Sequence, residues 1–146
     1  MGIDPADLGE LLARDDIVGL GESYWQGVLQ NRDRFLPIFE RTLAHGKTLE
    51  GHTAGARGGK LQAYAACGVS SCHEPINAEQ VLERLRLGLH VMIREGAVRK
   101  DLAEIAKIKD WGIDSRRLIL ASDSISPDEL MASGYMEAIV QKAIDC

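Results

Sequence analysis

The sequence predicts an α/β fold in which about five parallel strands alternate with helices. Five short apolar runs each end in a residue that can bind a metal or move a proton. The terminal residues are separated by intervals of 30, 21, 22 and 28 residues, about the length of one strand, one crossover helix and two short loops. The runs are Ile17–Glu22, Thr48–His52, Val69–His73, His90–Glu95 and Leu118–Asp123.

Helix signals lie before and between the first three runs. A cap residue followed by proline suits a helix start, so one helix is expected before the first strand. A proline inside the second helix is expected to bend or delay it. The signals are Asp4–Pro5 for the first helix, Asn31 as cap, Pro37 inside and Gly46 as stop for the second, and Lys60 to Ala66 for the third.

Helix signals also follow the third, fourth and fifth runs. Asn77 with Gln80 three residues later resembles a capping box and predicts a helix up to Gly88. Residues 98–111 have a helical apolar pattern. Ser126–Pro127, followed by two acids, is a strong start for another helix, and the residues from Tyr135 to Ile144 predict the last one.

Five strands are fewer than the eight of a closed (β/α) barrel, which typically needs about 250 residues. Either the chain forms a five-stranded open sheet, or it is the part of a barrel whose first strands lie outside these residues. Length alone favours a flavodoxin-like sheet. The chemistry at the strand ends favours the barrel, and no linker divides residues 1–146, so we expect a single domain.

Composition excludes several functional classes. The 146 residues carry a net charge of −5 and no cluster of basic and aromatic residues, which argues against nucleic-acid binding. No apolar run spans a bilayer, and the acidic N-terminus lacks the features of a signal peptide. We therefore expect no membrane partner, a cytoplasmic location and three reduced cysteines.

Four strand-end residues form a candidate metal site, because the strand C-termini of a parallel barrel share one face. Each residue alone has an ordinary structural explanation: Glu22 or Asp123 as a solvated acid or helix cap, and His52 or His73 as a structural histidine. Together, two carboxylates and two imidazoles are the ligand set of a hydrolytic site with one or two divalent ions.

Several motifs in this order resemble the adenine deaminases of the amidohydrolase superfamily, over nearly the whole chain. The most specific is His-Glu after a strand, followed about twenty residues later by Met-Ile-Arg-Glu-Gly. The matching segments are residues 19–22, 50–55, 58–64, 68–74, 85–88, 92–96 and 121–123.

The resemblance implies a partial TIM-like (β/α) barrel of the metal-dependent hydrolase type. The chain would supply strands four to eight, the C-terminal part, with strands one to three missing. Glu22 would bridge two ions, and His52 and His73 would bind one of them. Asp123 would bind the other ion and relay a proton to departing ammonia, so Glu22 and Asp123 are the catalytic candidates. The ions would be Mn, Fe or Zn.

The resemblance also implies a purine as the small-molecule partner. Glu74 and the Arg94–Glu95 pair would line its pocket, although Arg94 and Glu95 can equally be a buried ion pair. Tyr24 and Trp25 would wall the pocket by stacking, or belong to the core.

Two departures from the family pattern lie near the substrate, at Asp123–Ser124 and in the loop Ser23–Gln26, and the superfamily's His-x-His motif is absent from these residues. The sequence thus predicts an adenine-deaminase-like hydrolase that is inactive as this chain alone. An amidohydrolase acting on another cyclic amide or amino-heterocycle, or a non-catalytic assembly module, is the alternative. Unpaired outer strands predict a homo-oligomer, or association with a chain that carries the missing strands.

Overall fold

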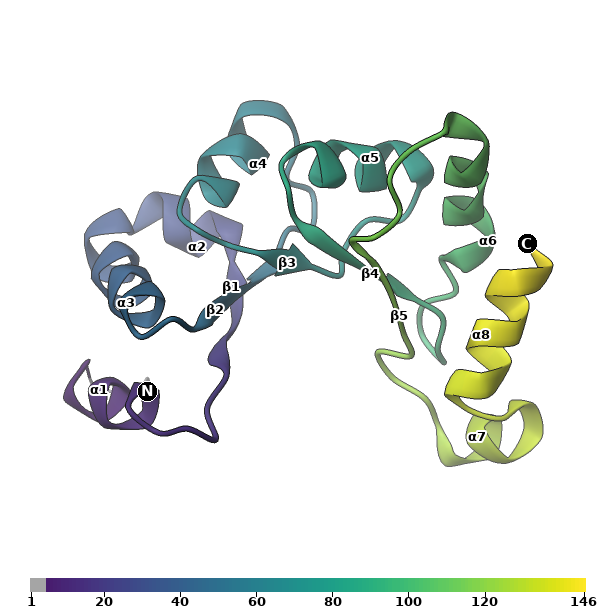
Figure 1. Ribbon diagram of the computed structural model, residues 1–146, viewed down its shortest axis with the longest axis horizontal. Coiled ribbons are helices and arrows are strands. Elements are labelled where there is room, and N and C mark those ends of the chain that lie inside the picture. The colour runs from purple at the N-terminus through teal and green to yellow at the C-terminus, as the bar shows by residue number, and fades with distance from the viewer. Residues whose placement is uncertain (1–4) are drawn as a thin grey trace. The chain divides into compact units, whose positions relative to one another are not determined.

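The computed structural model describes residues 5–146, in which strands alternate with helices (Figure 1). The chain divides into two compact units, Met1–Cys72 and His73–Cys146. Within each unit the named strands pair in parallel. The five parallel strands confirm the predicted α/β class and fit part of a (β/α) barrel. That the units form one domain stays a prediction, and Asp4, the expected first cap, lies outside the described residues.

The first unit contains three strands in the order β1, β2, β3. β2 ends at His52, as predicted, whereas β1 continues two residues beyond Glu22. β3 is only two residues long, and His73 follows it directly. The elements are α1 (Pro5–Leu12), β1 (Gly19–Tyr24), α2 (Trp25–Gln30), α3 (Arg32–Ala44), β2 (Thr48–His52), α4 (Gly58–Ala65) and β3 (Ser71–Cys72).

Two predictions about the helices of this unit are wrong in part. Asn31 occupies the N-cap position of α3, as expected, but its side chain accepts no capping hydrogen bond; its Nδ2 donates to the carbonyl oxygen of Gly27 at 3.2 Å. That bond belongs to α2, a six-residue helix that the sequence analysis missed. Pro37 lies inside α3 and does not delay it, since the helix begins at Arg32; the expected bend stays a prediction.

An irregularity in β1 places Glu22. The register pairs Leu20 with Leu49 and then Ser23 with Gly51. Two residues of β1, Gly21 and Glu22, therefore stand opposite one residue of β2. Such an extra residue is a β-bulge, which changes the direction in which nearby side chains point.

The second unit pairs β4 with β5, with Arg94 opposite Ala121. Both predicted caps are confirmed: Asn77 accepts a hydrogen bond from the Gln80 amide at 3.0 Å, and Ser126 accepts one from the Glu129 amide at 3.2 Å. The elements are α5 (Ala78–Arg86), β4 (His90–Arg94), α6 (Leu102–Ile105), a 3₁₀ segment (Ala106–Trp111), β5 (Leu118–Ala121), α7 (Pro127–Ser133) and α8 (Met136–Asp145).

The helix predicted over residues 98–111 starts later and is partly 3₁₀. Two contacts account for the late start. Glu95 pairs with Lys100 in an isolated antiparallel bridge, and its carboxylate accepts a hydrogen bond from the Leu102 amide at 3.1 Å. The segment between Glu95 and Lys100 is therefore a tight turn with bends at residues 96–98. α6 begins where the Glu95 carboxylate satisfies a free backbone donor.

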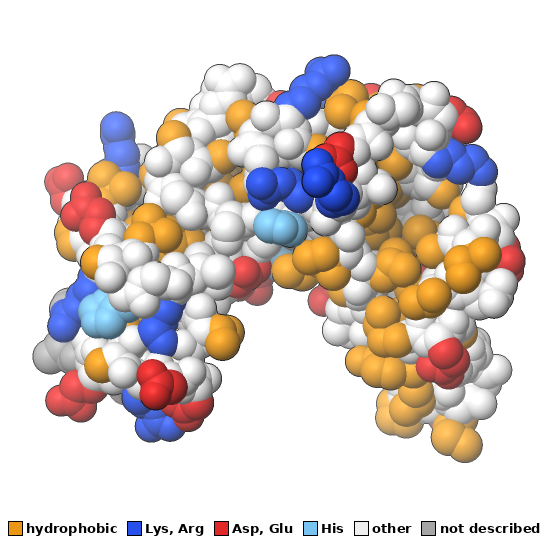
Figure 2. Space-filling view, in the orientation of Figure 1, with side chains coloured by type: hydrophobic (Ala, Val, Ile, Leu, Met, Phe, Trp, Pro, Cys, Tyr) orange, Lys and Arg blue, Asp and Glu red, His pale blue; other side chains and the backbone are white. Residues whose placement is uncertain are grey.

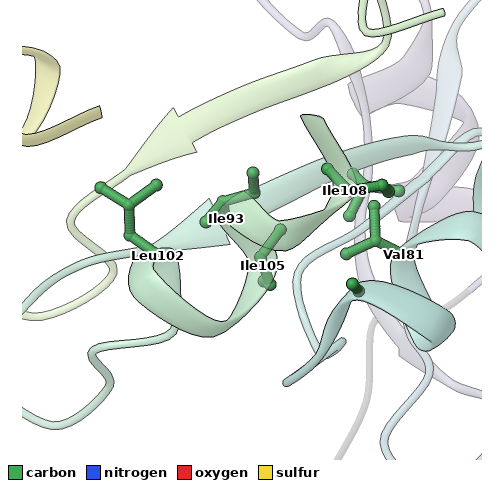
Figure 3. Packing of buried hydrophobic residues seen from close by; sticks show 7 residues of the cluster. Val81, Ile93, Leu102, Ile105 and Ile108 are labelled. Carbon is green, nitrogen blue, oxygen red and sulfur yellow. The ribbon is translucent and has the colours of Figure 1, made fainter. Parts of the chain in front are cut away.

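The core of the second unit lies between β4, α5 and the α6–3₁₀ segment (Figure 3). Val81, Ile93, Ile105 and Ile108 pack together there with Leu102. This packing fixes β4 relative to α5 and the α6–3₁₀ segment. It thereby positions the residues at the C-terminal end of β4. None of the helices in residues 5–146 has the length and apolar character that a bilayer crossing requires.

Candidate metal centre

In the first unit the structure brings Glu22 and His52 together. Nδ1 of His52 lies 3.2 Å from Oε1 of Glu22, the imidazole mostly buried and the carboxylate about half exposed. Glu22 comes from the bulge in β1, and His52 is the last residue of β2. Both side chains therefore lie at the C-terminal ends of neighbouring parallel strands, as predicted.

Two aromatic residues follow Glu22. The Tyr24 ring lies edge-on to the His52 imidazole, with 4.2 Å between ring centroids. Trp25 begins α2, and its Nε1 donates to the carbonyl oxygen of Ala54 at 2.7 Å, while the Lys60 ammonium lies 5.5 Å from its ring centroid. Tyr24 therefore borders the Glu22–His52 pair, and Trp25 is fixed beside the loop that follows His52.

A hydrogen-bond network that the sequence analysis missed joins α4 to the C-terminal parts of β1, β2 and β3. The buried Tyr64 hydroxyl lies 2.8 Å from the Ser23 hydroxyl and donates to the Ser23 carbonyl oxygen. Ser23 in turn donates to the Glu50 carbonyl oxygen at 3.2 Å, and Ser71 donates to the Glu50 carboxylate. Burial raises the pKa of Tyr64 above its ordinary value, against hydrogen bonds from Ser23 and the His52 backbone that lower it.

His73 is tied to this strand end by the chain itself. Gly51 pairs with Cys72 in the parallel β2–β3 register. His52 and His73 are the next residue on each strand, so their backbones leave neighbouring strands at the same level. Glu22, His52 and His73 each offer one ligand atom of the kind that divalent ions accept, as the sequence predicts for the ligands of one ion.

In the second unit, contacts around a buried guanidinium link His73 to Asp123. Nε2 of His73 lies 3.3 Å from Oε1 of Glu74, and the same oxygen accepts a hydrogen bond from Nη1 of Arg94 at 2.8 Å. Nη1 also lies 3.3 Å from Oδ2 of Asp123, and Nη2 lies 3.6 Å from Asp101. Arg94, only 6% exposed, therefore holds three carboxylates in one cluster.

Asp123 has a backbone conformation that is uncommon for a residue with a side chain, with a φ of 59°. The neighbouring turn after β4 holds it in place: the Glu95 amide donates to Ala121 at 2.9 Å, and the Ala97 amide donates to Ser124 at 2.6 Å. Gly96 lies between these two bonds. Backbone contacts on both sides of Asp123 thus fix its loop against the end of β4.

Glu95 points away from the Arg94 cluster. Its nearly buried carboxylate pairs with Lys142 of α8 and with the Leu102 amide. It lines a pocket of about 260 Å³ with Lys100, Glu129, Tyr135 and Ile139, among others. No ion pair between Arg94 and Glu95 occurs among the described residues, so the alternative of a buried Arg94–Glu95 pair is wrong. Arg94 pairs with Glu74, and Glu95 pairs with Lys142.

The donor set fits a divalent ion. Glu22 and Asp123 offer carboxylate oxygens, and His52 and His73 offer imidazole nitrogens, the ligands that Zn and related ions take in hydrolytic sites. The partly exposed Glu22 carboxylate and the mostly buried His52 imidazole lie close together at one strand end, which is compatible with binding of one ion by both.

Comparison with known proteins agrees with this chemistry. The chain is 40% identical to an adenine deaminase of Cenarchaeum symbiosum, over 97% of the chain and 24% of that protein. It is 38% identical to adenine deaminases of Clostridium botulinum and Moorella thermoacetica, again over 24% of each. The chain resembles a fragment of adenine deaminase.

The similarity has a defined extent. The chain spans about a quarter of the length of these adenine deaminases. Glu22, His52, His73 and Asp123 all belong to this chain. No protein-family model matches the chain.

Proposed function

We propose that this chain carries metal-binding and proton-transfer residues of an adenine-deaminase-like hydrolase, which converts adenine and water to hypoxanthine and ammonia. The observation that carries the proposal is the Glu22–His52 contact of 3.2 Å at the ends of neighbouring strands. Similarity to adenine deaminases over 97% of the chain supports it.

In this proposal Glu22, His52 and His73 hold a divalent ion, with Mn, Fe or Zn as candidates, and Asp123 binds a second one. An ion held by these residues would supply an activated water for attack on the amino-bearing ring carbon. Asp123 moves a proton to the departing ammonia. Arg94 keeps Asp123 and Glu74 in place through its ion pairs at 3.3 and 2.8 Å.

Substrate contacts are proposed for Glu74 and Arg94, beside Asp123, and for Trp25, beside the loop that follows His52. Glu95 was predicted with them, and its contacts with Lys142 and Leu102 give it a supporting position at the end of β4. The segment Ser23–Gln26, predicted as a loop, is the end of β1 and the start of α2. Its departure from the family pattern favours a second candidate function, hydrolysis of another cyclic amide or amino-heterocycle. A purine panel separates the two. A chain that binds no metal would instead fit a non-catalytic assembly module.

A segment exchange tests the proposed function directly. The 146 residues replace the matching quarter of the Cenarchaeum symbiosum adenine deaminase, and ammonia release from adenine is measured. We expect the hybrid to deaminate adenine, and its Glu22→Gln and Asp123→Asn variants to lose most of that activity. A folded hybrid whose activity is indifferent to both substitutions would contradict the assigned roles.

The 146-residue chain alone is expected to show little or no deaminase activity. Its four histidines include no His-x-His pair, so a second ion would lack most of its nitrogen ligands. The measurement is adenine hydrolysis by the chain loaded with Mn²⁺. Turnover within the ordinary enzymatic range of about 1 to 10³ per second would refute this expectation.

We also propose that the chain associates, either with a second copy or with a chain that carries further barrel strands. Val18 beside β1 is 81% exposed, and Met131 of α7 and Ile144 of α8 are 86% and 72% exposed. Figure 2 shows apolar side chains gathered over α7 and α8. Light scattering at micromolar concentration should give at least a dimer mass, and a stable monomer would contradict self-association. The cytoplasmic location stays a prediction.

A further inference from the structure

The bulge in β1 needs a fixed partner to present Glu22 in one direction. Gly21 and Glu22 occupy the extra position between the pairs Leu20–Leu49 and Ser23–Gly51, where the ladder is interrupted. Glu22 and Gly21 are exposed, so packing does not hold them. The nearest anchored residue is Ser23, which is buried.

Tyr64 supplies the anchor at Ser23. Its side chain reaches from α4, is fully buried, and contacts both the hydroxyl and the carbonyl oxygen of Ser23. The Ser23 hydroxyl also bonds the Glu50 carbonyl oxygen across the strand pair. The peptide that follows Glu22 is therefore fixed from α4 and from β2 at once.

The ring of Tyr64 fits closely over Gly51. A Cβ at Gly51 would lie 3.1 Å from Cε1 of Tyr64, 2.9 Å from the Ser71 carbonyl oxygen and 2.5 Å from Val69. The glycine thus leaves the space through which the phenol reaches Ser23. Gly51 precedes His52, so the same contact lies next to both members of the Glu22–His52 pair.

We propose that Tyr64 is a positioning residue: its hydroxyl holds the β1 bulge at Ser23 and so directs the Glu22 carboxylate toward the ion shared with His52. The inference rests on the proposed metal centre. Tyr64 is not among the residues proposed to touch metal or substrate, so it would act through Glu22. A tyrosine that only fills the core would need its ring and not its hydroxyl.

Tyr64→Phe separates these two roles, because it keeps the ring and removes the hydroxyl. The test is Co²⁺ titration of the 146-residue chain well below its unfolding temperature. We expect Tyr64→Phe to weaken Co²⁺ binding by about 10- to 100-fold, the usual effect of removing a group that orients a metal ligand without touching the metal. Tyr135→Phe, which removes a hydroxyl from a half-exposed tyrosine of the second unit, serves as the control and should bind as the unaltered chain does.

A double-mutant cycle tests whether Tyr64 acts through Glu22. In a Glu22→Gln background, Tyr64→Phe should cause no further loss of Co²⁺ affinity. Equal affinity of Tyr64→Phe and the unaltered chain, or a full additional loss in the Glu22→Gln background, would overturn the inference.

A measurement without metal keeps this inference separate from the proposed function. Amide hydrogen exchange at Gly21, Glu22 and Ser23 should accelerate in Tyr64→Phe, with Leu49 in β2 unchanged. Unchanged exchange at the bulge would overturn the positioning role even if the chain binds Co²⁺. Faster exchange in a chain that binds no Co²⁺ would support the anchor at Ser23 and contradict the metal centre instead.

Discussion

Replacing Gly96 with alanine is expected to destabilise the second unit by about 1 to 3 kcal/mol or more, because the added Cβ has no room. It would lie 1.9 Å from the Ser122 carbonyl oxygen and 2.3 Å from that of Ser124. Both atoms belong to the backbone of the loop that holds Asp123, so relief requires that loop to move. Thermal unfolding measures the effect as a lower Tm.

Gly59→Ala is the matched control. Gly59 lies in α4, where a Cβ would meet no atom within 4 Å outside its chain neighbours and the backbone of its own helix, and alanine is the better helix former. Its Tm should stay the same or rise. Equal Tm values for the Gly96→Ala and Gly59→Ala variants would show that the turn after β4 adapts freely and does not fix Asp123.

The second large effect is expected for His52→Ala. Removing an imidazole ligand should lower Co²⁺ affinity at least as much as removing a group that only orients a ligand, so we expect a loss of about 100-fold or more. His45→Ala is the control, since His45 is an exposed residue at the C-terminus of α3 whose Nδ1 lies 2.8 Å from the Arg41 carbonyl oxygen. The measurement is Co²⁺ titration of both variants. An equal loss in both would mean that the ion binds without a defined site.

The sequence located the strand ends well, because buried parallel strands are short apolar runs whose last residues are polar. His52 ends β2, and His73 and Glu95 directly follow β3 and β4, as predicted. The caps at Asn77 and Ser126 were also correct, since a cap depends on residues only three positions apart.

Features that depend on distant residues were not predictable from the sequence. The β1 bulge arises from its register with β2, about 28 residues away, and no local pattern around Gly21 signals it. The late start of α6 depends on where the Glu95 carboxylate points. Arg94 finds its partners 20 and 29 residues away, at Glu74 and Asp123. Local propensity cannot choose among such contacts.

The central claim is that Glu22, His52 and His73 hold one divalent ion. X-ray absorption at the zinc edge tests it most directly, on the 146-residue chain loaded with one equivalent of Zn²⁺. We expect two imidazole nitrogens at about 2.0 to 2.1 Å together with oxygen ligands, and the loss of one imidazole in His52→Ala but not in His45→Ala. A shell of sulfur, or of oxygen without imidazole, would contradict the claim.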